Sequence, residues 1–233
     1  MSRVRDYSPL DTPVRSALDG AHSRFRVTHG NVAGYQRDVA PFIAHPLLMA
    51  DDDWADLAAL GGPGVTLPLI ELENPTPPSG WRLVSQFGLV QMTGELFATA
   101  PEPDATRLGR SDVPDILDLV ARTKPGPFLD RTIELGTYLG IRRDGRLIAM
   151  AGERMHPAGW TEISAVCTDP DFRGEGLATR LMRAVGAGIV ARGETPFLHA
   201  SAANVGAIRL YTQLGFDLRK ESVMTIVETP RDA

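Results

Sequence analysis

A short glycine-rich loop at residues 173–179, Arg-Gly-Glu-Gly-Leu-Ala-Thr, carries the clearest chemical signal in this sequence. It follows a predicted strand at 162–168 and opens a predicted helix. The first N–H groups of a helix lack partners within the helix, and the helix dipole adds positive potential at the same end. Gly174 and Gly176 present no side chain that would keep an anion from the backbone, and Arg173 adds a guanidinium suited to phosphate. The loop predicts a pyrophosphate-binding site.

Two familiar nucleotide-binding loops fit this segment less well. No Lys-Ser/Thr pair follows the glycines, as it would in a Walker loop. The dinucleotide fingerprint needs a third small residue where this chain has Thr179, and it needs a tight strand-to-glycine turn where residues 169–173 intervene. For the loop taken alone, a solvent-exposed glycine turn before an ordinary helix is the alternative.

A second motif lies downstream, in the segment His-Ala-Ser-Ala-Ala-Asn at 199–204 and the predicted helix that follows it. With this motif, residues 163–216 resemble the GCN5-related N-acetyltransferases (GNAT), most closely their FR47-like branch. The family's Gln/Arg-x-x-Gly-x-Gly/Ala motif matches Arg173, Gly176 and Ala178. Its second signature, Asn-x-x-Ala…Tyr-x-x-Leu-Gly-Phe, matches Asn204, Ala207, Tyr211, Leu214, Gly215 and Phe216. The resemblance extends back to about Ala105 and so covers a little over half of the chain.

The resemblance implies acetyl-CoA as co-substrate and indicates where it would bind. The edge of the predicted strand at Val166, Cys167 and Thr168 would hold the pantetheine arm by backbone hydrogen bonds, and a backbone N–H there, at Val166, would polarise the thioester carbonyl. Simple burial in the sheet is the other interpretation of these residues. The pyrophosphate would lie against the loop, with contacts from Arg173, Gly174, Glu175, Gly176, Leu177, Ala178 and Thr179.

Asn204 and Cys167 have two interpretations each. The resemblance implies that Asn204 and Ala207 contact the cofactor, but helix capping alone would explain an Asn at position 204. Cys167 has no charged or His neighbour in the sequence that would lower the pKa of its thiol, and the family transfers the acetyl group directly. We therefore expect Cys167 to be structural rather than nucleophilic.

Acetyl transfer to an amine also needs a proton donor and, for a basic amine, a proton acceptor. Tyr211 matches the family's tyrosine that reaches the sulfur, which implies a general acid; core packing with Ile208 and Leu214 is the alternative. A lysine side chain has a pKa of ~10.4 and an α-amino group one near ~8, so the first needs a base more than the second. Glu162 is the first candidate base and Glu153 the second, and either could be an exposed strand carboxylate.

The elements around these residues alternate between strands and helices after about residue 105. The patterns predict helices at 51–61, 113–122, 130–136, 177–191 and 204–215, and strands at 65–72, 80–84, 89–92, 105–108, 138–142, 147–154, 160–168 and 196–200 with a terminal hairpin at 216–219 and 222–227. Pro68 favours an edge position for the strand at 65–72. The resemblance implies a mixed α/β (α+β) fold with a mainly antiparallel twisted sheet flanked by helices, splayed between its fourth and fifth strands.

A proline-rich stretch at 99–104 suggests a boundary between residues 1–102 and a GNAT domain at 103–233. The first part shows no cofactor motif. A faint likeness between its segment 80–92 and the predicted terminal hairpin suggests a degenerate GNAT-like copy. An unrelated α/β cap is the alternative.

Composition narrows the remaining possibilities. A net charge of −5 and a pI of about 5.5 argue against a nucleic-acid binder. Cys167 is the single cysteine, so the chain has neither an internal disulfide nor a cysteine metal cluster, and the five His residues show no metal-binding spacing. The sequence has no apolar leader at its start and no run long enough to span a membrane, so we expect a cytoplasmic location.

The sequence thus predicts an acetyl-CoA-dependent N-acetyltransferase that transfers the acetyl group directly to a primary amine on a small molecule or peptide. One alternative is a catalytically silent CoA-binding regulatory module. Another is an O-acyl or amino-acid conjugating enzyme on the same fold. The acceptor itself cannot be read from the sequence.

Overall fold

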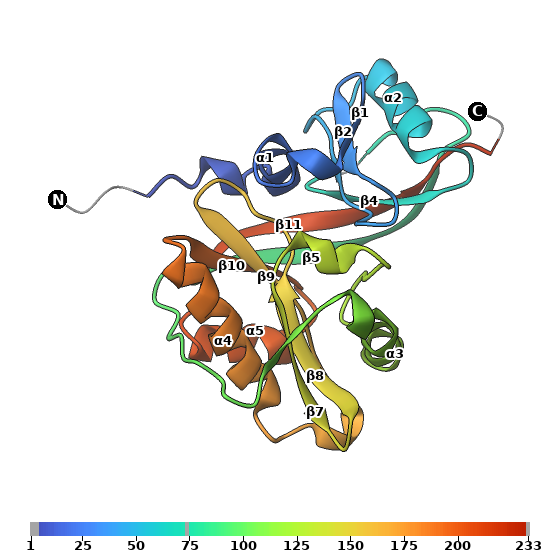
Figure 1. Cartoon of the computed structure of the whole chain (residues 1–233). Coiled ribbons are helices and arrows are strands. Elements are labelled where there is room, and N and C mark those ends of the chain that lie inside the picture. The colour runs from blue at the N-terminus through green and yellow to red at the C-terminus, as the bar shows by residue number, and fades with distance from the viewer. Residues whose placement is uncertain (1–4, 73–74, 232–233) are drawn as a thin grey trace.

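A large twisted sheet forms the body of the protein in the computed structural model (Figure 1), which describes residues 5–72 and 75–231. The first four residues of the polar N-terminal stretch lie outside this range. Within it, eight strands follow the spatial order β4-β11-β5-β10-β9-β8-β7-β6. Their bounds are β4 Thr66–Ile70, β5 Arg82–Thr93, β6 Thr106–Leu108, β7 Tyr138–Arg143, β8 Arg146–Glu153, β9 Trp160–Thr168, β10 Thr195–Ser201 and β11 Asp217–Glu228. The β9–β10 pair is parallel and the other pairs are antiparallel, which confirms the predicted mixed, mainly antiparallel sheet.

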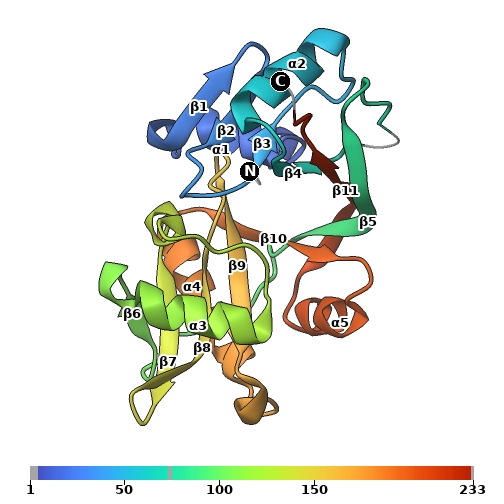
Figure 2. The same cartoon turned by 90° about the vertical axis from the view of Figure 1, so that its right-hand side faces the viewer.

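A smaller sheet with two helices lies beside β4 and β11, at the top of Figures 1 and 2. It contains β1 (Arg26–His29), β2 (Val32–Tyr35) and β3 (Ile43–Ala44), with α1 (Pro13–Asp19) and α2 (Asp51–Gly61) packed against it. The helix α2 has the predicted bounds. Its acidic first turn is favoured by the helix dipole, and Gly62 follows its end with a φ of +76°.

Helices cover both faces of the strands β7 to β9 (Figure 1). On one face lies α3 (Val113–Thr123) and on the other α4 (Leu177–Ala191); α5 (Val205–Gln213) follows β10. The apolar residues that recur every four positions in α4 are all buried against the sheet, as the sequence pattern predicted: Leu177, Leu181, Val185 and Ile189. The predicted helix at 130–136 is instead a short 3-10 turn, Thr132–Leu135, followed by the extended Gly136.

The sheet splays between β9 and β10, as predicted. The two strands pair only between residues 160–162 and 195–197 and then diverge. Beyond Glu162, no strand in the described part of the chain pairs with the inner edge of β9 on the β10 side. This opening is where a ligand can reach the backbone of β9.

Two predictions about the sheet were wrong. The predicted strands at 80–84 and 89–92 are one strand, β5, because Gly88 stays extended and pairs with Val223 of β11. The predicted terminal hairpin is also one strand, β11. The polar stretch that suggested a turn is absorbed by a shift in register between Leu218 and Lys220, a bulge rather than a reversal. The strand β4 lies at the edge of the sheet, as Pro68 indicated.

The long strand β5 lies between β10 and β11, pairing antiparallel with both. The sheet therefore runs across the predicted boundary between residues 102 and 103. One core cluster also joins the two ranges, since it contains Leu18, Phe42 and Leu89 together with Trp160 and Phe197. The side-chain packing that holds β5 in place is thus shared by both ends of the chain.

Candidate active site

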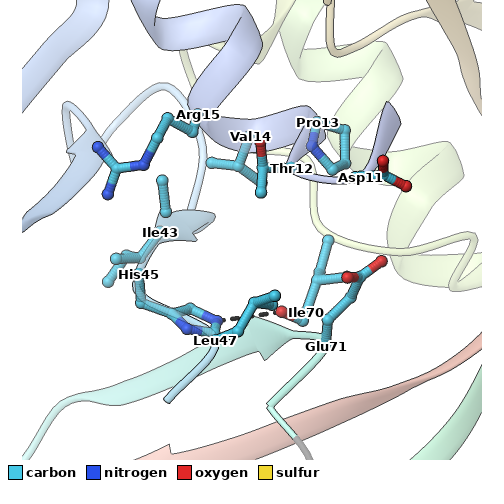
Figure 3. Close-up of a pocket in the computed structure, with 11 residues that line it drawn as sticks. Asp11, Thr12, Pro13, Val14, Arg15, Ile43, His45, Leu47, Ile70 and Glu71 are labelled. Atoms are coloured by element: carbon cyan, nitrogen blue, oxygen red, sulfur yellow. Dashed lines mark hydrogen bonds between the residues drawn. The ribbon is translucent and has the colours of Figure 1, made fainter. Parts of the chain in front are cut away.

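A cleft of about 1040 Å³ opens where β9 and β10 diverge. Its walls come from the end of β9, the glycine loop, the start of α4 and the face of α5, with the loop after α3 at one rim. Its opposite end is lined by residues of β5 and β11 and by Phe42. A separate hollow of about 30 Å³ lies beside His45, Ile70 and Arg15 (Figure 3) and has room for about one water molecule.

The glycine loop has the backbone that its sequence suggested. Gly174 and Gly176 have φ values of +86° and +72°, a region that favours glycine, and a Cβ built on either would meet no atom within 4 Å. Gly176 is the N-cap of α4 and Arg173 lies just before the loop, so the orphan N–H groups of this helix end face the cleft. This open, positively polarised cradle suits a pyrophosphate.

Glu175 and Asn204 have local structural partners. The Glu175 carboxylate pairs with Arg143 at 2.9 Å and does not line the cleft, so it is turned away from the cradle. The Asn204 Oδ1 accepts a hydrogen bond from the Ala207 N–H at 3.1 Å and caps α5. Asn204 and Ala207 nevertheless both lie on the cleft wall, so capping and contact with a ligand are compatible.

A bulge in β9 sets the backbone geometry at Val166. Ser164 pairs with Gly152 and Cys167 pairs with Met150, so two residues of β9 oppose one residue of β8. Ala165 takes a φ of +53°, unusual for a residue with a side chain. The extra residue of such a bulge is left out of the ladder. Val166 lies at this point on the cleft wall, where its N–H can serve a ligand.

Cys167 borders the cleft, but its thiol is not activated. Burial raises the pKa of the Cys167 thiol to about 11, so the thiol stays protonated at neutral pH. A protonated, buried thiol is a poor nucleophile. This supports the structural role expected for the residue, while Thr168 beside it pairs with Ala149 of β8 and also reaches the cleft wall.

Tyr211 lies on the wall formed by α5. Its ring packs edge-on against Phe216, with 6.3 Å between the ring centroids, and it borders the cleft. Burial raises the pKa of the Tyr211 hydroxyl above its ordinary value of 10. The phenol is therefore protonated at neutral pH and can donate a proton.

Neither predicted carboxylate base faces the cleft. The Glu162 side chain is fully buried and makes two hydrogen bonds to the Arg154 guanidinium, at 2.6 and 2.7 Å. Burial raises the pKa of Glu162, but the Arg154 charge and the hydrogen bonds from Arg154 and His199 outweigh it and hold that pKa at about 2. Glu153 is buried as well, bonded to Arg192 and to the Thr137 N–H. These ion pairs and hydrogen bonds explain why both carboxylates are buried, and neither carboxylate is placed to contact a substrate in the cleft.

His199 lines the cleft and belongs to the same polar network. The orientation of the Gln91 amide is fixed because its Nε2 donates to the Leu10 carbonyl and its Oε1 accepts from Arg219. The second Nε2–H of Gln91 then donates to His199 Nε2 at 3.1 Å, and His199 Nδ1–H donates to Glu162 at 2.8 Å. Both ring nitrogens of His199 are thus occupied by hydrogen bonds.

The sequence did not single out Arg154, His199 or the apolar residues at the far end of the cleft. Arg154 directly follows β8, next in the chain to the predicted candidate Glu153, but only the register of β8 against β9 brings its side chain to Glu162. The apolar residues come from the first part of the chain and from β11, and no local motif marks them. Among the residues that the structure describes, no group of three or more metal-ligating side chains occurs, and no helix is long and apolar enough to cross a membrane.

Comparison with known proteins identifies the family. The family model described as FR47-like protein matches residues 138–225. A solved GNAT-family structure from Novosphingobium aromaticivorans is 42% identical, with a TM-score of 0.86 over 95% of this chain and 98% of that one. A GCN5-related N-acetyltransferase from Kribbella flavida shares the fold, with a TM-score of 0.58 at 18% identity over 96% of this chain and 93% of that one. The chain belongs to the GNAT family of acetyltransferases and is an acyltransferase.

A curated relative matches over a shorter region. Mycothiol acetyltransferase from Thermomonospora curvata is 32% identical over 137 residues, which are 58% of this chain. The match spans only 41% of that protein's length. The similarity thus supports acetyl transfer in general and leaves the acceptor open.

Proposed function

We propose that this chain transfers an acetyl group from acetyl-CoA directly to a primary amine. The observation that carries the proposal is the convergence of three features on one cleft: the glycine loop, the bulge at Val166 and the Tyr211 phenol. Each serves a different part of a thioester substrate. Their order along the cleft follows the chain, since the loop lies beyond the end of β9 and the bulge lies within the strand.

The cradle fits a CoA pyrophosphate on physical grounds. The space above Gly174 and Gly176 is open, the α4 N-terminus supplies N–H donors, and Arg173 supplies a cation. Among the residues that the structure describes, no strand pairs with the edge of β9 beyond Glu162 on the β10 side, so an extended, amide-bearing arm can pair with it. In this arrangement the thioester reaches Val166.

The transfer forms a C–N bond between the amine nitrogen and the acetyl carbonyl carbon and breaks the C–S bond. The Val166 N–H donates a hydrogen bond to the carbonyl oxygen, where negative charge develops. The departing thiolate takes the Tyr211 proton. The amine loses one proton to solvent, and solvent restores the proton of Tyr211. Because no Asp or Glu of the described residues lines the cleft, we propose that the amine attacks in its neutral form without a carboxylate base.

Calorimetry and a thiol-release assay test this function. Acetyl-CoA should bind and raise the melting temperature by mass action, and a panel of primary amines should accelerate release of CoA thiol. If acetyl-CoA does not bind at millimolar concentration, the proposal is wrong. Binding without transfer to any amine in the panel would favour the silent CoA-binding module instead.

A further inference from the structure

The end of the cleft on the side of Val166 away from the glycine loop is lined by different residues, among them Arg154. Arg154 lies beside the start of β9, since its N–H donates to the Glu162 carbonyl at 3.0 Å. Val166 lies four positions beyond Glu162 on β9, a span on the order of 10 Å. Arg154 and Val166 both line the cleft, and the glycine loop lies on the other side of Val166. The Arg154 end is therefore where an acceptor would approach a thioester held at Val166.

Arg154 has unused hydrogen-bonding capacity. A guanidinium has five N–H donors, and Glu162 occupies two of them through Nε and Nη2. The other three bond to none of the residues that the structure describes. The group is also held in place, because it lies 4.6 Å from the centroid of the Phe42 ring. A fixed guanidinium with a free edge on a cleft wall is suited to a carboxylate, which it can bind with two hydrogen bonds.

Apart from Arg154 and His199, the walls at this end are apolar. They are formed by Phe42, Ile70, Phe87, Leu89 and Met224, and all but Phe87 are buried. The charged side chains on the described walls of the whole cleft are cations: Lys124, Arg154 and Arg173. A second ammonium group on the acceptor would find no counter-ion here, whereas an apolar body with a carboxylate would find both partners.

We infer that the acceptor is an α-amino acid with an apolar or aromatic side chain, its carboxylate bound by Arg154 and its side chain packed against Phe42, Phe87 and Met224. This rests on the proposed acetyl transfer. It is consistent with the absence of a carboxylate base from the described cleft walls, because an α-amino group loses its proton more readily than a lysine side chain does. The products would be an N-acetyl amino acid and CoA thiol.

A set of matched acceptors tests the inference with the full chain. L-phenylalanine should be acetylated with a kcat/KM at least about tenfold above that of L-phenylalaninamide, which lacks the carboxylate, and of glycine, which lacks the apolar body. The diamine 1,6-diaminohexane should be poorer still. A preference for the amide or the diamine would overturn the inference while leaving acetyl transfer intact. Failure to bind acetyl-CoA at all would remove the proposed function, and the inference with it.

Product binding gives a readout that does not depend on turnover. With CoA present, calorimetry should show saturable binding of N-acetyl-L-phenylalanine and binding of N-acetyl-L-phenylalaninamide weaker by at least about tenfold. Arg154→Lys keeps the charge beside Glu162 but loses the planar fork, and it should remove this difference between the two ligands. Equal binding of both ligands to the parent protein would contradict the carboxylate contact.

Two substitutions on β5 remain informative even if Arg154→Lys fails to fold. Phe87→Glu places a carboxylate on the acceptor wall. It should therefore lower kcat/KM for L-phenylalanine and raise it for 1,6-diaminohexane, which shifts the ratio of the two values by at least about tenfold. Leu83→Glu is the control, since Leu83 lies on the same strand, is similarly exposed (48% against 43%) and does not line the cleft. A ratio unchanged by Phe87→Glu, or changed equally by Leu83→Glu, would overturn the assignment.

Discussion

Tyr211 places a protonated phenol on the cleft wall, where it faces the proposed path of the leaving thiolate. Tyr211→Phe keeps the packing of the ring against Phe216 and removes only the proton donor. General acid catalysis typically contributes ~10²–10⁴ in rate, so kcat should fall at least about tenfold with little change in the Kd for acetyl-CoA. Steady-state kinetics and calorimetry on the two proteins measure this. An unchanged kcat would show that Tyr211 only packs in the core and does not donate a proton.

Glu162 holds the side chains of Arg154 and His199 in place through hydrogen bonds. Glu162→Gln would leave the buried Arg154 charge without its counter-ion, and breaking such a pair costs roughly 3–5 kcal/mol of unfolding free energy. We therefore expect chemical denaturation to show a large loss of stability. Glu175→Gln is a control, because it breaks an exposed pair with Arg143 and should change the melting temperature little. A stable Glu162→Gln protein whose rate is rescued at high pH would restore Glu162 as the base.

The same pair predicts a pH dependence of stability. The pKa of Glu162 is lowered from its usual 4.5 to about 2 by folding, so the folded state binds its proton less readily than the unfolded chain. Its contribution is complete above pH 4.5 and is lost as the pH falls from 4.5 towards 2. Denaturation midpoints measured across this range should decline, and the decline should be smaller in Glu162→Gln.

The ion-pair partner of Glu162 could not be predicted from the sequence. Its position on β9 was clear from the sequence, but its partner Arg154 lies on another part of the chain and reaches it only through strand register. The glycine loop and Asn204 could be found because their chemistry is local: a backbone turn and a helix cap. A residue whose role depends on a long-range ion pair carries no such local signal.

At the scale of the elements, the turn into α4 depends on Gly176. With a φ of +72°, this position disfavours a β-branched side chain, which would also enter the open space of the cradle. We expect Gly176→Val to weaken acetyl-CoA binding by at least about tenfold in calorimetry. Gly145→Val is the matched control, because Gly145 has a φ of +79° and open surroundings but lies in the β7–β8 turn and does not line the cleft. It should bind acetyl-CoA as the parent does. Loss of binding in both variants would point to general destabilisation.

The helices α2 and α4 were predicted more accurately than the strands β5 and β11, for a physical reason. The bounds of α2 and α4 follow from spacing and from terminal glycines, which are local. The continuity of β5 and β11 depends on pairing with each other over residues 82–93 and 217–228. Gly88 and the polar stretch at 219–222 suggest turns when read alone, and the neighbouring strand makes them extended. The sheet order has the same origin, so it could not be read along the chain.

At the scale of the whole molecule, the cleft is assembled from both ends of the chain. The cradle and Tyr211 come from residues after 160, whereas Phe42, Ile70 and Phe87 come from the first hundred residues. The strand β5 lies between them, bridging β10 and β11. In the inferred acceptor site, the first part of the chain would supply apolar wall residues, although it shows no cofactor motif.

This arrangement bears on the boundary predicted between residues 102 and 103. A fragment of residues 103–233 would lose β5, leaving facing edges of β10 and β11 without a partner and exposing core residues such as Phe197 and Met224. We expect this fragment to aggregate or to unfold without a cooperative transition.

A fragment of residues 65–233 keeps β4 and β5 and should retain more structure. Circular dichroism melts of the two fragments beside the whole chain measure the difference. Adding residues 1–102 to the shorter fragment should rescue acetyl-CoA binding if loss of β5 is the cause. Cooperative folding and acetyl-CoA binding by residues 103–233 alone would show that the two ranges are separate domains after all.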